Sequence, residues 1–110
     1  HGLGDRFLAH VERCRALIHL VDGTHDDVAA AYQTIRHELA AYSAALADKP
    51  ELLVLNKIDA LDADTLELRR QALAEASGSP VRAISGVSGH GVRDLMRAAA
   101  ALLAEESAPA

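Results

Sequence analysis

A short polar group, Asn56-Lys57-Ile58-Asp59, directly follows an apolar run in the sequence LLVLNKIDAL. The run has the length and character of a buried strand, so the polar side chains would lie just beyond its carboxyl end. Ligands of parallel α/β sheets bind outside the carboxyl ends of the strands. A turn needs only one Asn or Asp, and Lys contributes nothing to it. The group therefore indicates a ligand site, with a simple strand-to-helix turn as the alternative interpretation.

The chemistry that these side chains fit best is recognition of a guanine base. A carboxylate such as Asp59 accepts two parallel hydrogen bonds from adjacent donors, and guanine offers such a pair at N1–H and its exocyclic amine. Adenine lacks both donors and would leave the carboxylate desolvated and unpaired, at a cost of about 1–3 kcal/mol. The methylene stem of Lys57 can lie along a base face. The amide of Asn56 both donates and accepts, so it can hold a neighbouring loop in place.

A glycine-rich group, SGVSGHG at residues 85–91, follows the next strand-like run. Small residues let a backbone approach a ligand closely, and an exposed backbone N–H there could donate to the O6 carbonyl of guanine. Taken alone, the segment is more typical of a strand-to-helix turn, as is Asp22-Gly23-Thr24 after the first run. Together with the group at 56–59, it predicts a slot of the size of a base.

The elements that must position these groups follow from hydrophobic periodicity. Short apolar runs predict strands at 16–21, 51–56 and 81–85. Helical spacing predicts helices over 4–14, from Val28 to Leu46, around Leu66–Ala76 and from Val92 to Leu103. Thr24 and Asp27 are placed like a capping box for the long second helix. The order α-β-α-β-α-β-α predicts an α/β fold of three layers, with a parallel sheet covered by helices on both faces.

Length and composition limit the functional classes. The chain has 110 residues, half of them hydrophobic, and a formal net charge of −5. We expect residues 1–106 to form one domain and 107–110 a disordered tail, in a chain that is part of a longer protein. No basic block is present, so we expect no direct DNA binding, although a local contact with RNA stays open. No apolar run is long enough for a membrane span, and the single cysteine, Cys14, favours a cytoplasmic location.

The polar groups carry a family resemblance. NKID followed by a strand and SGV resembles the guanine-specificity half of the P-loop GTPases, with their N-K-x-D and S-A-x signatures. The segments GLGDRFLAHVERCRALIHLVD and ADKPELLVLNKIDAL more specifically resemble the Obg family of ribosome-associated GTPases. The resemblance covers residues 2–104, nearly the whole chain. It implies a partial P-loop NTPase-like G domain, of which residues 1–106 are the C-terminal half.

The resemblance also implies a function. A member of this family is a GTPase that binds GTP or GDP with Mg²⁺, contacts the large ribosomal subunit and takes part in ribosome biogenesis. Asp59 would pair with the guanine edge, Lys57 would pack on the base, and Asn56 would brace the loop. The backbone N–H groups of Ser85-Gly86-Val87 would close over O6. The expected base-binding set is Asn56, Lys57, Ile58, Asp59, Ser85, Gly86 and Val87.

The chain departs from the family pattern at one residue and in several missing motifs. Gly86 stands where Ala is usual, a mild change because the contact comes from the main chain. The motif G-x-x-x-x-G-K-[ST] is missing, and with it the phosphate cradle and the hydroxyl that binds Mg²⁺. The switch threonine loop and D-x-P-G are missing too. Phosphoryl transfer depends on these parts, so we expect no GTP hydrolysis by this chain alone, and we assign it no catalytic residue and no metal ligand.

Other polar residues have structural interpretations. The six histidines show no zinc-site spacing, so we expect no metal site among them. We expect His19 to be packed with one hydrogen bond, His90 to be a solvated turn residue, and Cys14 to be a core residue of the first helix.

A second class of function stays open: a non-catalytic α/β signalling or protein-interaction module in which NKID is a coincidental turn. A receiver-type domain would need several acidic residues at its first strand, where only Asp22 is found. In a complete G domain the P-loop strand should flank ALIHLV on its open side. Without that strand, we expect an exposed apolar edge, aggregation and marginal stability.

Overall fold

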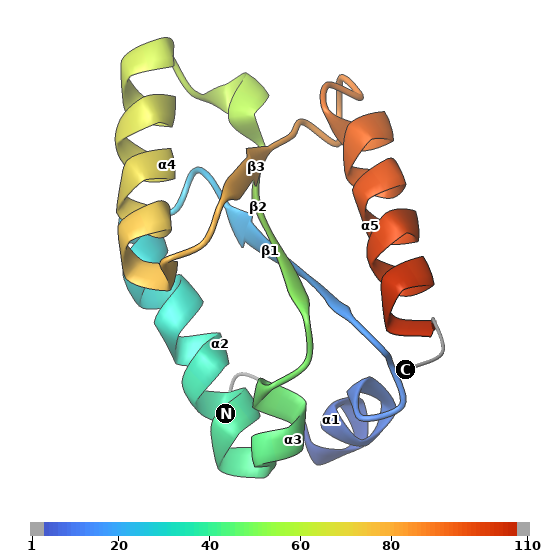
Figure 1. The fold of residues 1–110 in the computed structure, drawn as a ribbon. Coiled ribbons are helices and arrows are strands. Elements are labelled where there is room, and N and C mark those ends of the chain that lie inside the picture. The colour runs from blue at the N-terminus through green and yellow to red at the C-terminus, as the bar shows by residue number, and fades with distance from the viewer. Residues whose placement is uncertain (1–3, 108–110) are drawn as a thin grey trace.

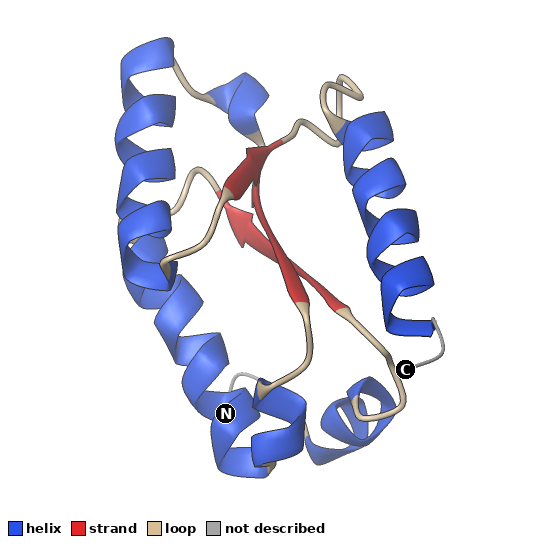
Figure 2. Cartoon of the chain, in the orientation of Figure 1, coloured by secondary structure: helices blue, strands red, loops and turns tan. Residues whose placement is uncertain are grey.

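A computed structural model describes residues 4–107. Helices and strands alternate around a three-stranded parallel sheet, which confirms the predicted α/β class (Figures 1 and 2). The strands lie in the order β1 (Leu17–Asp22), β2 (Glu51–Asn56) and β3 (Val81–Ala83). The helices are α1 (Asp5–Val11), α2 (Val28–Tyr42), α3 (Ala44–Ala47), α4 (Ala63–Ser77) and α5 (Val92–Ser107), with a 3₁₀ helix, η1 (Ile58–Ala60), after β2.

Helices cover both faces of the sheet, as predicted. In Figure 1, α2 and α4 lie on one side of the strands and α5 on the other. The side chains of β2 alternate between two buried layers, because successive residues of a strand point to opposite faces. Leu53 and Leu55 pack with Leu73 of α4, whereas Val54 packs with Leu95 of α5. The central strand is thus buried on both faces, which is why its sequence is almost uniformly apolar.

The strand register brings the polar strand ends together. β1 pairs with β2 from Leu17 opposite Glu51 to Asp22 opposite Asn56. β3 pairs with β2 over a shorter stretch that ends with Leu55 opposite Ala83. All three strands run in parallel, so the residues that follow them meet at one edge of the sheet.

The second predicted helix is divided. α2 ends at Tyr42, and Ser43 adopts an extended conformation with φ −166° and ψ 132°. The Ser43 side chain then accepts a hydrogen bond from the backbone N–H of Leu46, which begins the separate helix α3. The division allows Leu46 to turn inward, where it is fully buried with Leu8 and Leu39.

The predicted capping box at Thr24 and Asp27 is wrong. Asp27 is itself the N-cap of α2, and its Oδ1 accepts a hydrogen bond from the N–H of Ala30 at 3.0 Å. The hydroxyl of Thr24 instead donates to Oδ1 of Asp22 at 2.6 Å. A carboxylate two residues upstream competes for that hydroxyl, so the N-cap of the helix is Asp27, three residues after Thr24.

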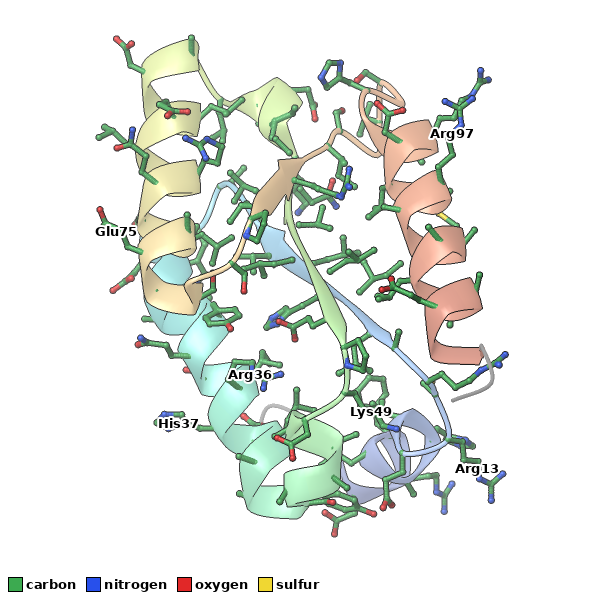
Figure 3. All side chains as sticks on the ribbon, in the orientation of Figure 1. Arg13, Arg36, His37, Lys49, Glu75 and Arg97 are labelled. Atoms are coloured by element: carbon green, nitrogen blue, oxygen red, sulfur yellow. The ribbon has the colours of Figure 1, made fainter. Side chains whose placement is uncertain are left out.

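The first predicted helix ends earlier than expected, and the expectation that Cys14 is a core residue is wrong. α1 ends at Val11, after which the N–H groups of Arg13 and Cys14 bond to carbonyls three residues back. Cys14 lies exposed in this turn. Its carbonyl accepts a 2.6 Å hydrogen bond from Lys49 Nζ, so the turn is fastened to the start of the β2 segment (Figure 3).

Two further boundaries differ from the prediction. β3 ends at Ala83 instead of residue 85, because the carbonyl of Ile84 accepts a hydrogen bond from Ile58 of η1 and not from a strand. Ser107 belongs to α5 and not to a disordered tail, and residues 108–110 lie outside the described range. Within residues 4–107, no helix has the length and apolar content needed to cross a membrane.

Candidate functional site

Asn56 connects the two loops that the sequence predicted to act together. It is the last residue of β2, and its Oδ1 accepts hydrogen bonds from the N–H of Lys57 at 2.8 Å and of Gly86 at 3.3 Å. The second contact spans 30 positions of sequence. The amide of Asn56 therefore holds the group at 56–59 beside the glycine-rich loop, the bracing role expected for it.

Asp59 and Ser85 are in direct contact. The hydroxyl of Ser85 donates to Oδ1 of Asp59 at 2.7 Å and accepts a hydrogen bond from the N–H of Ser88 at 3.0 Å. Ser85 is 1% exposed, whereas Asp59 is exposed to solvent. Asp59 is not a helix cap: the residue before η1 is Lys57, and no side chain caps that helix. Within residues 4–107, Oδ2 of Asp59 has no hydrogen-bond partner and can accept one from a ligand.

Lys57 has an unusual backbone. Its φ of 64° makes it the one non-glycine residue in residues 4–107 with a positive φ. Its side chain does not extend freely into solvent, because Nζ forms an ion pair with Oδ2 of Asp22 at 2.9 Å. The lysine stem thus runs from the end of β2 toward the end of β1.

Asp22 takes part in the site, although the sequence indicated only a turn. Its Oδ1 accepts hydrogen bonds from the N–H of Thr24 at 2.9 Å and from its hydroxyl at 2.6 Å. The hydroxyl of Thr24, then Lys57 and then the N–H of Thr24 hold the pKa of the Asp22 carboxyl well below its usual range. The carboxylate is therefore ionised at neutral pH. The one available signal was its place at a strand end, opposite the strand that ends in Asn56.

The backbone around the site is closely packed. The N–H of Gly23 donates to the carbonyl of Asn56 at 2.8 Å, and a Cβ at Gly23 would lie only 2.5 Å from that oxygen. The carbonyl of Gly23 in turn accepts a 2.6 Å hydrogen bond from Arg69 Nη1 of α4. The side chain of Ile58 is partly buried against the core formed by β1, β2, α2 and α4. Ile58 thus anchors the loop, and its neighbours face the solvent.

The glycine-rich loop leaves its main chain accessible. Gly86 is exposed, and the side chain of Val87 is 89% exposed. A Cβ at Gly86 would meet only Oδ1 of Asn56, at 3.8 Å, so the alanine found in the resembling family would fit. His90 is exposed in the same loop, as expected, and its carbonyl accepts a hydrogen bond from the N–H of Ser85 at 3.0 Å.

A second polar cluster lies inside the fold, away from this edge. His19 is packed as expected, with its ring stacked on Tyr32 at a centroid distance of 5.2 Å. The expected hydrogen bond is not formed: Nδ1 lies 3.4 Å from Oε2 of Glu51 but is buried without a hydrogen-bond partner in the described range. Arg36 reaches from α2 to the same carboxylate at 3.2 Å (Figure 3). Burial opposes ionisation of Glu51, but the proximity of His19 and Arg36 outweighs it and lowers its pKa below 4.5.

Comparison with protein-family models finds none that matches the chain. The geometry at the carboxyl edge of the sheet therefore carries the functional assignment. Across residues 4–107, no group of three or more His, Cys, Asp or Glu side chains is arranged to hold a metal ion.

Proposed function

We propose that this chain recognises the guanine base of GTP and GDP within an Obg-like GTPase. The observation that supports this most strongly is the contact between Asp59 and Ser85, accompanied by that between Asn56 and Gly86. These contacts bring an exposed carboxylate and an accessible main chain together at the carboxyl edge of a parallel sheet, where ligands of such folds bind.

Asp59 supplies the specificity in this proposal. Its two oxygens accept the N1–H and the exocyclic amine of guanine as a pair of charge-assisted hydrogen bonds. A carboxylate oxygen accepts more than one hydrogen bond, so Oδ1 can keep its bond from Ser85 while it receives one from the base. Adenine presents no donor at N1 and no amine at C2, and it would leave the carboxylate unpaired.

The remaining residues of the expected set have defined parts in the same proposal. The stem of Lys57 covers a face of the base, which an alkyl chain with a solvated ammonium group can do. The N–H of Gly86 donates to Asn56 Oδ1 at 3.3 Å, a long hydrogen bond that the O6 carbonyl of the base would share as a second acceptor. Ser85 orients Asp59, and the exposed Val87 contributes its backbone N–H to the part of the loop that closes over O6.

The left-handed conformation of Lys57 favours this function over a coincidental turn. A turn that needs a positive φ is formed more easily by glycine or asparagine. Strained backbone conformations are concentrated at functional sites, where a particular side chain must be presented. A lysine at φ 64° beside the exposed carboxylate of Asp59 fits a ligand site better than a protein-interaction module.

Hydrolysis of GTP requires phosphate-binding and Mg²⁺-binding groups that this chain does not supply. It contains no P-loop motif, and its described residues offer no metal-holding cluster. We propose that these groups come from other parts of a longer protein and that Mg²⁺ binds there. The cytoplasmic location and the role at the large ribosomal subunit belong to the same proposal.

The deciding experiment is Asp59→Asn in the full-length protein. An amide donor at this position suits the C2 carbonyl of xanthine, so affinity for GDP should fall at least about tenfold while xanthosine diphosphate becomes the preferred ligand. Competition against a fluorescent nucleotide measures both affinities. Asp64→Asn makes the same chemical change on an exposed residue of α4 and should alter neither. Equal affinity for GDP in the Asp59 variant and the parent protein would refute the proposed function.

A further inference from the structure

Lys57 is held in its unfavourable conformation from two directions. Oδ1 of Asn56 accepts a hydrogen bond from the backbone N–H of Lys57 at 2.8 Å, which fixes the lysine backbone. Oδ2 of Asp22 accepts a hydrogen bond from Nζ at 2.9 Å, which fixes the far end of the side chain. Asp22 and Asn56 face each other as the last paired residues of β1 and β2. The lysine stem therefore crosses between neighbouring strand ends with both of its ends anchored.

Asp22 is itself oriented. Its other oxygen, Oδ1, is occupied by two hydrogen bonds from Thr24, one from the backbone at 2.9 Å and one from the hydroxyl at 2.6 Å. Only Oδ2 faces Lys57. The two side chains are 43% and 56% exposed, so the ion pair itself adds little to folding stability. Its effect lies in restricting the lysine to one direction.

We propose that Asp22 is a positioning residue that acts through Lys57: it holds the ammonium group so that the lysine stem forms a fixed wall of the base slot. This inference rests on the proposed function of Asp59. A wall that is ordered before the ligand arrives costs less conformational entropy on binding, and its loss should appear mainly as faster ligand release. Because the stem touches a base face and not its edge, Asp22 should affect guanine and xanthine nucleotides alike.

The test measures dissociation of a fluorescent GDP from the full-length protein. Asp22→Ala should accelerate release about tenfold, as expected for a lost positioning contact in one binding site. Lys57→Met keeps an unbranched stem without the charge, and adding Asp22→Ala to it should produce no further acceleration. Raising the salt concentration should speed release from the parent protein but not from Asp22→Ala, because an exposed ion pair is screened by salt.

A structural role for Asp22 predicts different results. If Asp22 only stabilises the Thr24 turn, its replacement will act equally in the parent and Lys57→Met backgrounds, and the salt response will persist. If Asp22 positions Lys57, Thr24→Val, which removes only the hydroxyl bond to Asp22, should give a release rate between those of the parent protein and Asp22→Ala, with the salt response retained. Asp62→Ala removes a carboxylate that caps a helix, α4, away from Lys57, and should change folding stability without changing the salt response of release.

The outcomes separate this inference from the proposed function. If Asp59→Asn switches base preference but Asp22→Ala leaves release unchanged, or acts equally without the Lys57 charge, the positioning role is refuted and base recognition stands. If Asp59→Asn does not alter base preference, the proposed function is refuted and the inference is refuted with it.

Discussion

The hydroxyl of Ser85 lies 2.7 Å from Oδ1 of Asp59, and the two residues are 26 positions apart in sequence. One partner is almost fully buried and the other is exposed. A buried hydroxyl has little freedom to move, so it sets the direction of the solvent-exposed carboxylate. The orientation of the proposed base-reading group thus depends on the core beneath it.

Ser85→Ala should therefore weaken both the site and the fold. It removes the bond to Asp59 and leaves the N–H of Ser88 without its acceptor, so the free energy of unfolding should fall by about 1–2 kcal/mol. GDP affinity of the full-length protein should fall about three- to tenfold. Urea unfolding and nucleotide titration measure the two effects. The control is Ser88→Ala. Ser88 is exposed and its hydroxyl accepts a long bond, 3.3 Å, from the N–H of His90, so this change should leave the free energy of unfolding and GDP affinity nearly unchanged.

Gly23 and Gly86 form a matched pair at the site. A Cβ at Gly23 would lie 2.5 Å from the carbonyl oxygen of Asn56 and 3.2 Å from Leu61, so the strand ends would have to separate. Gly23→Ala should lower the free energy of unfolding by about 1–3 kcal/mol, as overpacking does, and weaken GDP binding by displacing Asn56. Gly86→Ala meets only ordinary contact and should change stability by less than about 0.5 kcal/mol. Similar losses in both variants would contradict this description of the strand ends.

The contacts of Glu51 with Arg36 and His19 should make the free energy of unfolding depend on pH. Its folded-state pKa lies below the ordinary 4.5, so it stabilises the fold above that pH and loses this contribution as the pH falls through the lowered value. Glu51→Gln should reduce stability by about 1–2 kcal/mol at neutral pH. Urea unfolding between neutral and strongly acidic pH should show this difference shrinking below pH 4.5.

The matched control for Glu51 is Glu75→Gln. Glu75 projects outward from α4 in Figure 3, on the side opposite the outward-pointing Arg97 of α5. Its replacement should leave the stability difference near zero at every pH. If the stability difference for Glu51→Gln stayed constant down to strongly acidic pH, burial of this carboxylate, and not its contacts with Arg36 and His19, would govern its ionisation.

The open edge of β1 should cause the isolated chain to self-associate. Phe7, Ile18 and Leu20 are 54%, 42% and 53% exposed and border a hollow of about 220 Å³ along this edge. An edge strand with exposed apolar side chains is a template for pairing with another copy. Leu20→Lys should shift the chain toward monomer, measured by light scattering over a range of concentrations. Leu68→Lys, at a position that is 68% exposed on α4, should not. A parent chain that stays monomeric at high concentration would contradict the prediction.

Much of the fold could be predicted from local pattern. The strands begin and end within about two residues of their expected positions, because continuous apolar runs bounded by Gly, Pro and polar residues have few other solutions. The errors occurred where short-range hydrogen bonds compete. The Thr24 hydroxyl, expected to cap α2, donates to Asp22 instead. Ser43 caps a separate helix, α3, where one long helix was expected. Hydrogen bonds to carbonyls three residues back end α1 at Val11, and Cys14 lies exposed in the turn that follows.

One contact between the strand-end groups was expected from the sequence, and another was not. Asn56 and Ser85–Val87 were expected to meet, since both follow neighbouring parallel strands, and Asn56 does bond to Gly86. The ion pair of Lys57 with Asp22 was not expected. Asp22 lies 35 positions away in sequence, and a turn after the first strand was sufficient to explain an aspartate there.

Periodicity and strand-end chemistry were therefore sufficient to indicate the α/β class and a polar site at one edge of the sheet, since both follow from interactions between residues close in sequence. The pairing of Asp22 with Lys57 and the burial of Ser85 beneath Asp59 depended on strand order and register in three dimensions. A shift of one residue in the register of β1 would turn the side chain of Asp22 to the other face of the sheet, away from Lys57. For that reason, such pairings can be assigned only once the strands are placed side by side.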